Sequence, residues 1–196
     1  MINTLDYYNH FAKEYCDQTK NADLHETLDR FLGYLDKDAL ILDFGCGSGR
    51  DTKYFMERGF SVEAVDGSKE LCTLASEYTG VVVKQMFFQD LKEKDRYDGI
   101  WACSSILHLP INELKQVLVN MAVALRENGI IYTSFKYGTF SGERNGRYFT
   151  DMTEDSFRNL IVGIDELFIL EQWVTADVRP GRSQEKWLNL LLKKQG

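Results

Sequence analysis

Short apolar runs alternate with amphipathic stretches over the first two thirds of the chain. Five runs are short, apolar and bounded by turn residues, as expected for strands, at residues 39–44, 60–65, 80–86, 97–103 and 129–135. Three intervening stretches have the apolar spacing of helices, at residues 50–58, 68–78 and 112–126. Strands that alternate with helices predict a parallel sheet with right-handed crossovers.

The pattern differs at the two ends of the chain. Two amphipathic helices, at residues 4–16 and 23–35, predict an N-terminal helical cap over residues 1–36. After the fifth strand, a helix is expected first, and two apolar runs follow it at residues 167–175 and 187–192. The turn between these runs is short, which favours an antiparallel pair at the end of the sheet.

The first predicted strand ends in a glycine-rich turn, with the sequence I-L-D-F-G-C-G-S-G at residues 41–49. Glycines at alternate positions let the backbone turn sharply and leave its amides uncovered, so a ligand can lie against the main chain. A dinucleotide fingerprint, G-x-G-x-x-G, needs a glycine where this chain has Arg50. Taken alone, the turn fits a simple strand-to-helix connection as well as a cofactor site.

The segment D-F-G-C-G-S-G resembles motif I of the class I S-adenosylmethionine (SAM) dependent methyltransferases, through Asp43, Gly45, Gly47 and Gly49. The resemblance implies a Rossmann-like three-layer α/β sandwich. Its seven-stranded, mostly parallel sheet would have the order 3-2-1-4-5-7-6, with the last inserted strand antiparallel. It also implies that SAM is the cofactor and S-adenosylhomocysteine the product, with Gly45, Cys46, Gly47 and Gly49 beside the methionine portion and the ribose. Asp43 either contacts the methionine amine or orients the turn.

Two further acidic residues fit this cofactor. Asp66 ends the second predicted strand about 20 residues beyond the glycines, where a carboxylate can accept hydrogen bonds from both ribose hydroxyls. Gly67 and Ser68 share that turn and are expected to contact the cofactor as well. The alternative for Asp66 is a surface carboxylate or a helix cap. By resemblance, Asp90 accepts from the adenine amino group and the backbone amide of Leu91 meets the ring.

The fourth predicted strand and the first helix supply the other candidates. By resemblance, the carbonyl of Cys103 receives the ammonium group of the cofactor. In the next loop, His108 either takes a proton from the acceptor or simply bonds to backbone. Tyr8, Phe11 and Tyr15 form an aromatic stripe that either packs on the sheet or covers the cofactor, as in many related enzymes. We expect Phe11 in the core, Tyr15 at the cofactor and Tyr8 at the acceptor.

Later loops bring positive charge to the same edge of the sheet. They carry four arginines, Arg144, Arg147, Arg179 and Arg182. Guanidinium groups bind carboxylates and phosphates in bidentate pairs, so these residues predict an acceptor with an anionic group. The alternative is that they pair with Glu143, Asp151, Asp177 or the cofactor carboxylate and hold the loops shut.

Composition narrows the function classes. The 196 residues, 44% of them apolar, fit a single domain over 1–196 with a full core. Residues 1–135 hold 14 Lys and Arg against 21 Asp and Glu, which argues against extended nucleic-acid binding and favours a small-molecule acceptor. Four cysteines without a C-x-x-C pair, and no apolar run of about 18 residues, predict a cytoplasmic protein that does not cross a membrane.

The expected function is SAM-dependent methyl transfer to a small molecule by direct in-line displacement. We expect no metal site, since His10, His25 and His108 have no ligand spacing. Three alternatives stay open at this stage: a nicotinamide oxidoreductase, a non-catalytic SAM sensor, and a methyltransferase acting on a modified nucleoside. The sequence names neither the acceptor, nor the methylated atom, nor the oligomeric state.

Overall fold

The computed structural model describes residues 4–196. Its helices are α1 (Thr4–His10), α2 (Ala12–Thr19), α3 (His25–Leu32), α4 (Arg50–Glu57), α5 (Lys69–Thr79), α6 (Ile111–Ala124) and α7 (Glu154–Ile161), with short 3-10 helices η1 (Phe88–Asp90) and η2 (Ile106–His108). Its strands are β1 (Leu40–Phe44), β2 (Ser61–Asp66), β3 (Lys84–Gln85), β4 (Tyr97–Ala102), β5 (Leu125–Lys136), β6 (Ser141–Arg144), β7 (Arg147–Thr150), β8 (Leu167–Ala176) and β9 (Lys186–Lys194). Within this range, no helix combines the length and apolar content needed to cross a membrane.

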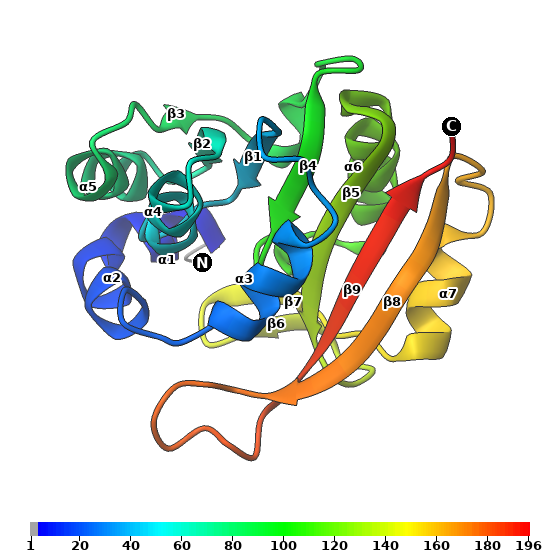
Figure 1. Cartoon of the computed structure of the whole chain (residues 1–196). Coiled ribbons are helices and arrows are strands. Elements are labelled where there is room, and N and C mark those ends of the chain that lie inside the picture. Colours follow the sequence, from blue (N-terminus) through cyan, green and yellow to red (C-terminus); the bar gives the residue numbers. More distant parts are fainter. Residues whose placement is uncertain (1–3) are drawn as a thin grey trace.

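Seven strands form one sheet in the order β3-β2-β1-β4-β5-β9-β8 (Figure 1). Strands β1 to β5 pair in parallel, whereas β9 is antiparallel to both of its neighbours, β5 and β8. The strands β6 and β7 form a separate two-stranded sheet. When only the strands of the large sheet are numbered, their order is 3-2-1-4-5-7-6, which confirms the predicted fold class.

Helices cover both faces of this sheet and so complete the three layers (Figure 1). Buried side chains of α6 and α7 pack on one face, and those of α3 and α4 pack on the other. Strand β1 serves both cores, because Leu42 and Phe44 belong to the first and Ile41, between them, belongs to the second. Side chains alternate across a strand, so a strand between two helical layers is mostly apolar on both faces. Asp43 is the polar exception in β1.

The predicted first helix is broken in the structure. Phe11 separates α1 from α2 and has non-helical backbone angles, φ −105° and ψ 19°. It is half-buried and packs against the rings of Tyr7 and His10 rather than in a core cluster. The prediction that Phe11 lies in the core is therefore wrong. The break lets α1 and α2 take different directions over the carboxyl edge of the sheet.

Two other elements differ from the sequence prediction. The third strand, predicted over residues 80–86, is only Lys84–Gln85, because β3 is an edge strand that pairs with just the end of β2. The hairpin β6–β7 was not predicted. Its turn is Asn145-Gly146 with positive φ at both residues, 53° and 74°, which is the pattern of a type I′ hairpin turn. That dipeptide was the signal in the sequence that could have found it.

Candidate cofactor and acceptor site

Two adjoining cavities open where β1, β2 and β4 end. The first, here the Asp66 cavity, is bordered by residues that include Asp66, Gly67, Leu71, Met86, Phe87 and Phe88. The second, here the arginine cavity, is bordered by residues that include Arg50, Cys103, Lys136, Arg147, Arg179 and Arg182. Five residues border both cavities: Tyr8, Tyr15, Gly45, Ser104 and His108. The two cavities are therefore parts of one site.

Asp66 is a buried carboxylate at the end of β2. One oxygen accepts from the backbone amide of Gly47 at 2.9 Å, and the other accepts from that of Ser68 at 2.8 Å. Burial raises its pKa, and the backbone amides of Ser68, Gly47 and Gly67 oppose that rise. Each carboxylate oxygen has two acceptor positions. Asp66 thus keeps capacity for further donors, such as the hydroxyls of a ribose.

The three glycines of the turn have different roles. Gly45 and Gly47 have positive φ, 87° and 56°, and border the cavities. A Cβ atom on Gly47 would lie 3.0 Å from the ring of Tyr15. Gly49 also has positive φ, but its added Cβ would lie 2.7 Å from the side chain of Thr79 on α5, and Gly49 borders neither cavity. Its position is explained by the close approach of two helices.

The Asp66 cavity fits a nucleoside. Apolar side chains of Leu71, Met86, Phe87 and Phe88 form its walls, and Asp66 supplies a carboxylate at one end. Such walls suit a flat heterocycle, and the carboxylate suits its sugar. The glycine turn continues from there to the arginine cavity, which Gly45 and Cys46 border.

Three other predicted cofactor residues lie differently. The side chain of Asp90 is exposed, and that of Leu91 is buried in the core; neither residue borders the Asp66 cavity. Asp43 is buried below the turn, where it accepts from Thr52 Oγ1 at 2.5 Å and borders neither cavity. Of the two roles predicted for Asp43, this contact favours orientation of the turn. Burial and the nearby Asp51 carboxylate raise the pKa of Asp43 to about 8.

Ser68 is a helix cap. Its hydroxyl accepts from the Leu71 amide at 3.2 Å and donates to Asn9 Oδ1 at 2.7 Å, so it joins α5 to α1. The residue is fully buried and borders neither cavity. Its predicted contact with cofactor therefore has no support in the position of the side chain.

Replacing the Ser68 cap gives a stability prediction. Ser68→Ala should lower the free energy of unfolding by about 1 kcal/mol, because the first turn of α5 loses an acceptor. Affinity for SAM should change less than twofold. Chemical denaturation and calorimetry measure the two quantities, and Thr73→Ala on the exposed face of α5 is the control. A large loss of affinity with unchanged stability would restore Ser68 to the cofactor site.

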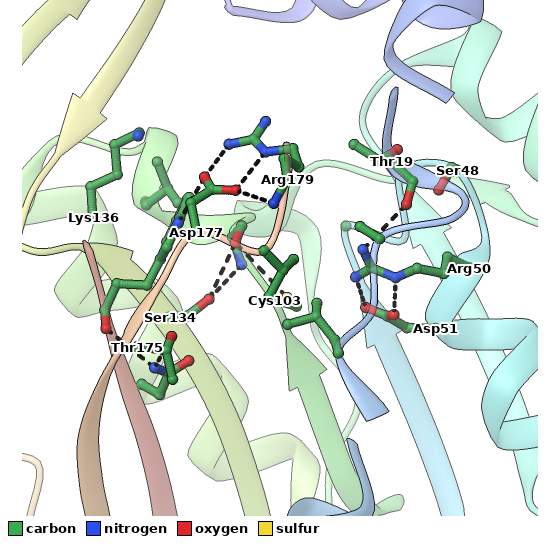
Figure 2. Close-up of a pocket in the computed structure, with 18 of the residues that line it drawn as sticks. Thr19, Ser48, Arg50, Asp51, Cys103, Ser134, Lys136, Thr175, Asp177 and Arg179 are labelled. Carbon is green, nitrogen blue, oxygen red and sulfur yellow. Dashed lines mark hydrogen bonds and ion pairs between the residues drawn. The ribbon is translucent and has the colours of Figure 1, made fainter. Parts of the chain in front are cut away.

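Arg50 and Asp51, at the start of α4, are functional candidates that the sequence analysis did not select. Arg50 donates to Asp51 through Nε at 2.6 Å and Nη2 at 2.9 Å, and Trp101 Nε1 donates to the same carboxylate at 2.8 Å. Figure 2 shows this pair on one side of the arginine cavity and the pair of Asp177 with Arg179 on the other. The position of these two charged residues directly after the glycine turn was the signal in the sequence that could have identified them.

Tyr8, His108 and Arg147 form a hydrogen-bonded chain between the cavities. His108 Nδ1 lies 2.6 Å from the carbonyl oxygen of Tyr148, which can only accept, so Nδ1 carries the proton. Burial lowers the pKa of His108 to about 4, so the ring is neutral at pH 7 and Nε2 is an acceptor. Tyr8 Oη donates to Nε2 at 2.8 Å and accepts from Arg147 Nη1 at 3.3 Å.

Three of the four predicted arginines border the arginine cavity: Arg147, Arg179 and Arg182. Arg144 does not; it borders a neighbouring surface pocket and pairs with Asp151 at 2.9 Å. Arg179 pairs with Asp177 at 2.5 Å, and the exposed Arg182 lies 3.8 Å from Glu185. The alternative that arginines pair with loop carboxylates thus holds for Arg144 and Arg179.

The cysteine at the end of β4 is chemically quiet. Cys103 borders the arginine cavity, and burial raises the pKa of its thiol to about 12. It is therefore a thiol and not a thiolate at neutral pH. Figure 2 shows Cys103 between the Arg50–Asp51 pair and the Asp177–Arg179 pair.

A glycine turn, a buried carboxylate and an apolar pocket at the carboxyl edge of a Rossmann-like sheet define a protein that binds a nucleoside-containing cofactor. Residues 41–129 match the family model described as "Methyltransferase domain". A protein of Staphylococcus carnosus named "Uncharacterized methyltransferase" is 24% identical over 166 residues, 77% of this chain and 80% of its own length. One of the same name from Anoxybacillus flavithermus is 26% identical, over 83% of this chain and 84% of its own length.

Solved structures show the same fold. The 1,6-didemethyltoxoflavin-N1-methyltransferase of Burkholderia thailandensis, with S-adenosylhomocysteine bound, has a TM-score of 0.76 and 22% identity, over 97% of this chain and 85% of its own. The [4+2]-cyclase SpnF has a TM-score of 0.75 and 12% identity, over 97% of this chain and 94% of its own. Taken with the match of residues 41–129 to a methyltransferase domain, these findings support a class I SAM-dependent methyltransferase, with SAM as methyl donor. The nicotinamide alternative is set aside.

Proposed function

We propose that the protein methylates a small molecule that carries an anionic group, by direct in-line displacement. One observation carries the proposal: a cavity bordered by Arg147, Arg179 and Arg182 adjoins the Asp66 cavity and shares five bordering residues with it. A methyl donor in one cavity and an acceptor in the other would meet at Tyr8, Tyr15 and His108. The acceptor's anion would then face the arginines.

Different residues of the chain would bind different parts of the cofactor. Asp66 accepts from the ribose, the backbone of the Gly45–Gly47 turn faces the methionine portion, and Arg50, fixed by Asp51, offers a cation to its carboxylate. When bound, SAM supplies an electrophilic methyl group on a sulfonium sulfur. The protein must then hold the acceptor atom about 3 Å from that carbon and keep water out.

The aromatic residues of α1 and α2 exclude water. Tyr8 and Tyr15 pack edge to face, with ring centroids 5.2 Å apart, and both border the two cavities. Tyr15 also lies against Gly47. Aromatic faces at this position attract a sulfonium cation as well as covering it.

Tyr8 and His108 are placed to accept the proton that an N–H or O–H acceptor loses. The neutral His108 has its Nε2 lone pair directed at Tyr8, whose hydroxyl borders both cavities. A proton that leaves the acceptor can pass to Tyr8 Oη while the Tyr8 proton passes to Nε2. His108 with a pKa of about 4 is a weak base, so it suits an acceptor that becomes acidic as it is methylated.

An acceptor panel tests the proposal. Purified protein and SAM with a labelled methyl group are incubated with carboxylates and phosphates, and with amide or amine analogues matched in size. We expect kcat/KM for the best anionic acceptor to exceed that of its neutral analogue by at least about tenfold, the value of one charge-assisted hydrogen bond. A cationic or apolar best acceptor would contradict the anionic class, and SAM binding without transfer to any compound would favour the sensor alternative.

Arg147 gives the sharpest single substitution for acceptor choice. Arg147→Ala should lower kcat/KM for the anionic acceptor by about tenfold, because it removes a cation from the cavity wall. Affinity for SAM, measured by calorimetry, should stay within about twofold. Arg144→Ala is the matched control, since Arg144 is on the same hairpin but outside the arginine cavity. Equal kcat/KM in both variants and the native protein would remove Arg147 from acceptor recognition.

A further inference from the structure

Arg147, Tyr8 and His108 are joined in a closed circuit that begins and ends on β7. Arg147 donates to Tyr8 at 3.3 Å, Tyr8 donates to His108 at 2.8 Å, and His108 donates to the carbonyl of Tyr148, the residue after Arg147, at 2.6 Å. The amide of Tyr148 in turn donates to Thr4 Oγ1 on α1 at 2.9 Å. The hairpin, α1 and η2 are thus held to one another around these groups.

Arg147 differs from the other arginines in its partners. Among residues 4–196, ion pairs are found for Arg144, Arg179 and Arg182, and none is found for Arg147. Its guanidinium lies over the ring of Tyr7 at 4.4 Å, and its Nε is buried without a hydrogen-bond partner. Because Arg147 also borders the arginine cavity, an anion bound there would pair with its guanidinium.

We propose that the anionic group of the acceptor binds Arg147 and thereby makes the Tyr8–His108 pair a better proton acceptor. Arg147 is then a positioning and specificity-determining residue that links recognition of the acceptor to its deprotonation. This inference rests on the proposed function, because it needs an anionic acceptor in the arginine cavity.

The physical reason is the charge of Arg147. A cation close to His108 disfavours the imidazolium form, and it acts here in addition to burial, which is the larger cause of the low pKa. The guanidinium also donates a hydrogen bond to Tyr8 Oη. This bond occupies a lone pair of the oxygen that must receive the acceptor's proton. An anion paired with Arg147 offsets its charge and draws its N–H groups away from Tyr8. Both changes favour proton transfer to Nε2.

The other groups that face His108 do not supply this control. Tyr8 comes from α1, the carbonyl of Tyr148 and the ring of Phe149 come from β7, and Asp66 and Glu113 border the Asp66 cavity that His108 shares. Of these, the carboxylates lie in the cofactor cavity, whereas Arg147 borders the arginine cavity. An acceptor bound in the arginine cavity would therefore contact Arg147 and not these carboxylates.

The proton and the methyl group balance in this scheme. The acceptor atom bonds to the methyl carbon, and the electron pair of the broken carbon–sulfur bond stays on sulfur. The acceptor's proton goes to Tyr8 Oη as the Tyr8 proton goes to His108 Nε2. When the methylated product leaves with its anion, the charge of Arg147 is no longer offset, and His108 releases the proton to water.

The test is a pH titration of the histidine ring signals by NMR, in the protein saturated with S-adenosylhomocysteine, with inorganic phosphate as the probe. His108 is assigned with H108Q, and the surface residues His10 and His25 report general effects of phosphate. Phosphate, compared with chloride at equal ionic strength, should raise the pKa of His108 by about one unit in the native protein. Arg147→Ala should start from a higher pKa and show no response to phosphate.

Two further variants complete the experiment. Arg147→Lys keeps the charge and should keep the response, and Arg144→Ala, outside the cavity, should respond like the native protein. An unchanged His108 signal in native protein with phosphate, or the same response in Arg147→Ala, would overturn the inference. That failure leaves methyl transfer to anions intact, whereas failure of the proposed function appears in the acceptor panel and not in this titration.

Discussion

Gly47→Val should abolish measurable SAM binding, with an expected loss of at least about 100-fold in affinity, or roughly 2.8 kcal/mol. Gly47 has a φ of 56°, which a branched side chain rarely adopts, and its added Cβ would lie 3.0 Å from the Tyr15 ring. Tyr15 borders both cavities, so a valine at position 47 that displaces the Tyr15 ring changes the shape of both cavities. Calorimetry with SAM and with S-adenosylhomocysteine measures the effect.

Gly59→Val is the control for the effect of backbone strain in Gly47→Val. Gly59 also has positive φ, 88°, but nothing lies within 4 Å of its added Cβ. That variant should lose stability and keep its affinity for SAM. If Gly47→Val binds SAM like the native protein, the glycine turn is only a strand-to-helix connection.

Asp66→Ala should weaken SAM binding by roughly 1 to 3 kcal/mol, which is about 5- to 150-fold in Kd. The variant removes the acceptor proposed for the ribose diol. It also leaves the amides of Gly47 and Ser68 without their partner, so the glycine turn loses its fixed position. Calorimetry measures affinity, and a thermal melt recorded in parallel shows whether the variant is folded at the temperature of the titration.

Two companion variants separate these effects. Asp66→Asn keeps one oxygen that can accept from an amide but loses the charge, so its affinity should lie between those of Asp66→Ala and the native protein. Asp165→Ala removes an exposed carboxylate between α7 and β8 and is the control. Unchanged affinity in a folded Asp66→Ala protein would rule out the ribose assignment.

Local patterns were enough to predict most of the large sheet. The apolar strand β1 and the glycine turn after it depend on residues adjacent in sequence, and both were found. The order of the seven strands followed from the family resemblance. The hairpin β6–β7 was missed although Asn145-Gly146 marks its turn, because only a few residues on each side carry its pattern.

The break at Phe11 shows the limit of periodicity. Tyr8, Phe11 and Tyr15 have helical spacing, and each does lie in or beside a helix. This spacing does not predict a helix end at Phe11. The break depends on contacts that α1 makes with residues far along the chain. Tyr8 bonds His108, 100 residues away, and Ser68 bonds Asn9, 59 residues away.

For the candidate site, the residue types that meet at the carboxyl edge could be predicted, since parallel strands bring their ends together there. Asp66, the glycines, His108 and the arginines were found in this way. The partners of these residues depend on the folded chain. Arg144 and Arg179 are paired with carboxylates and Arg147 is not, and His108 is a neutral acceptor held by Tyr148. Charge, protonation and hydrogen bonding depend on distances between distant segments, which no local pattern specifies.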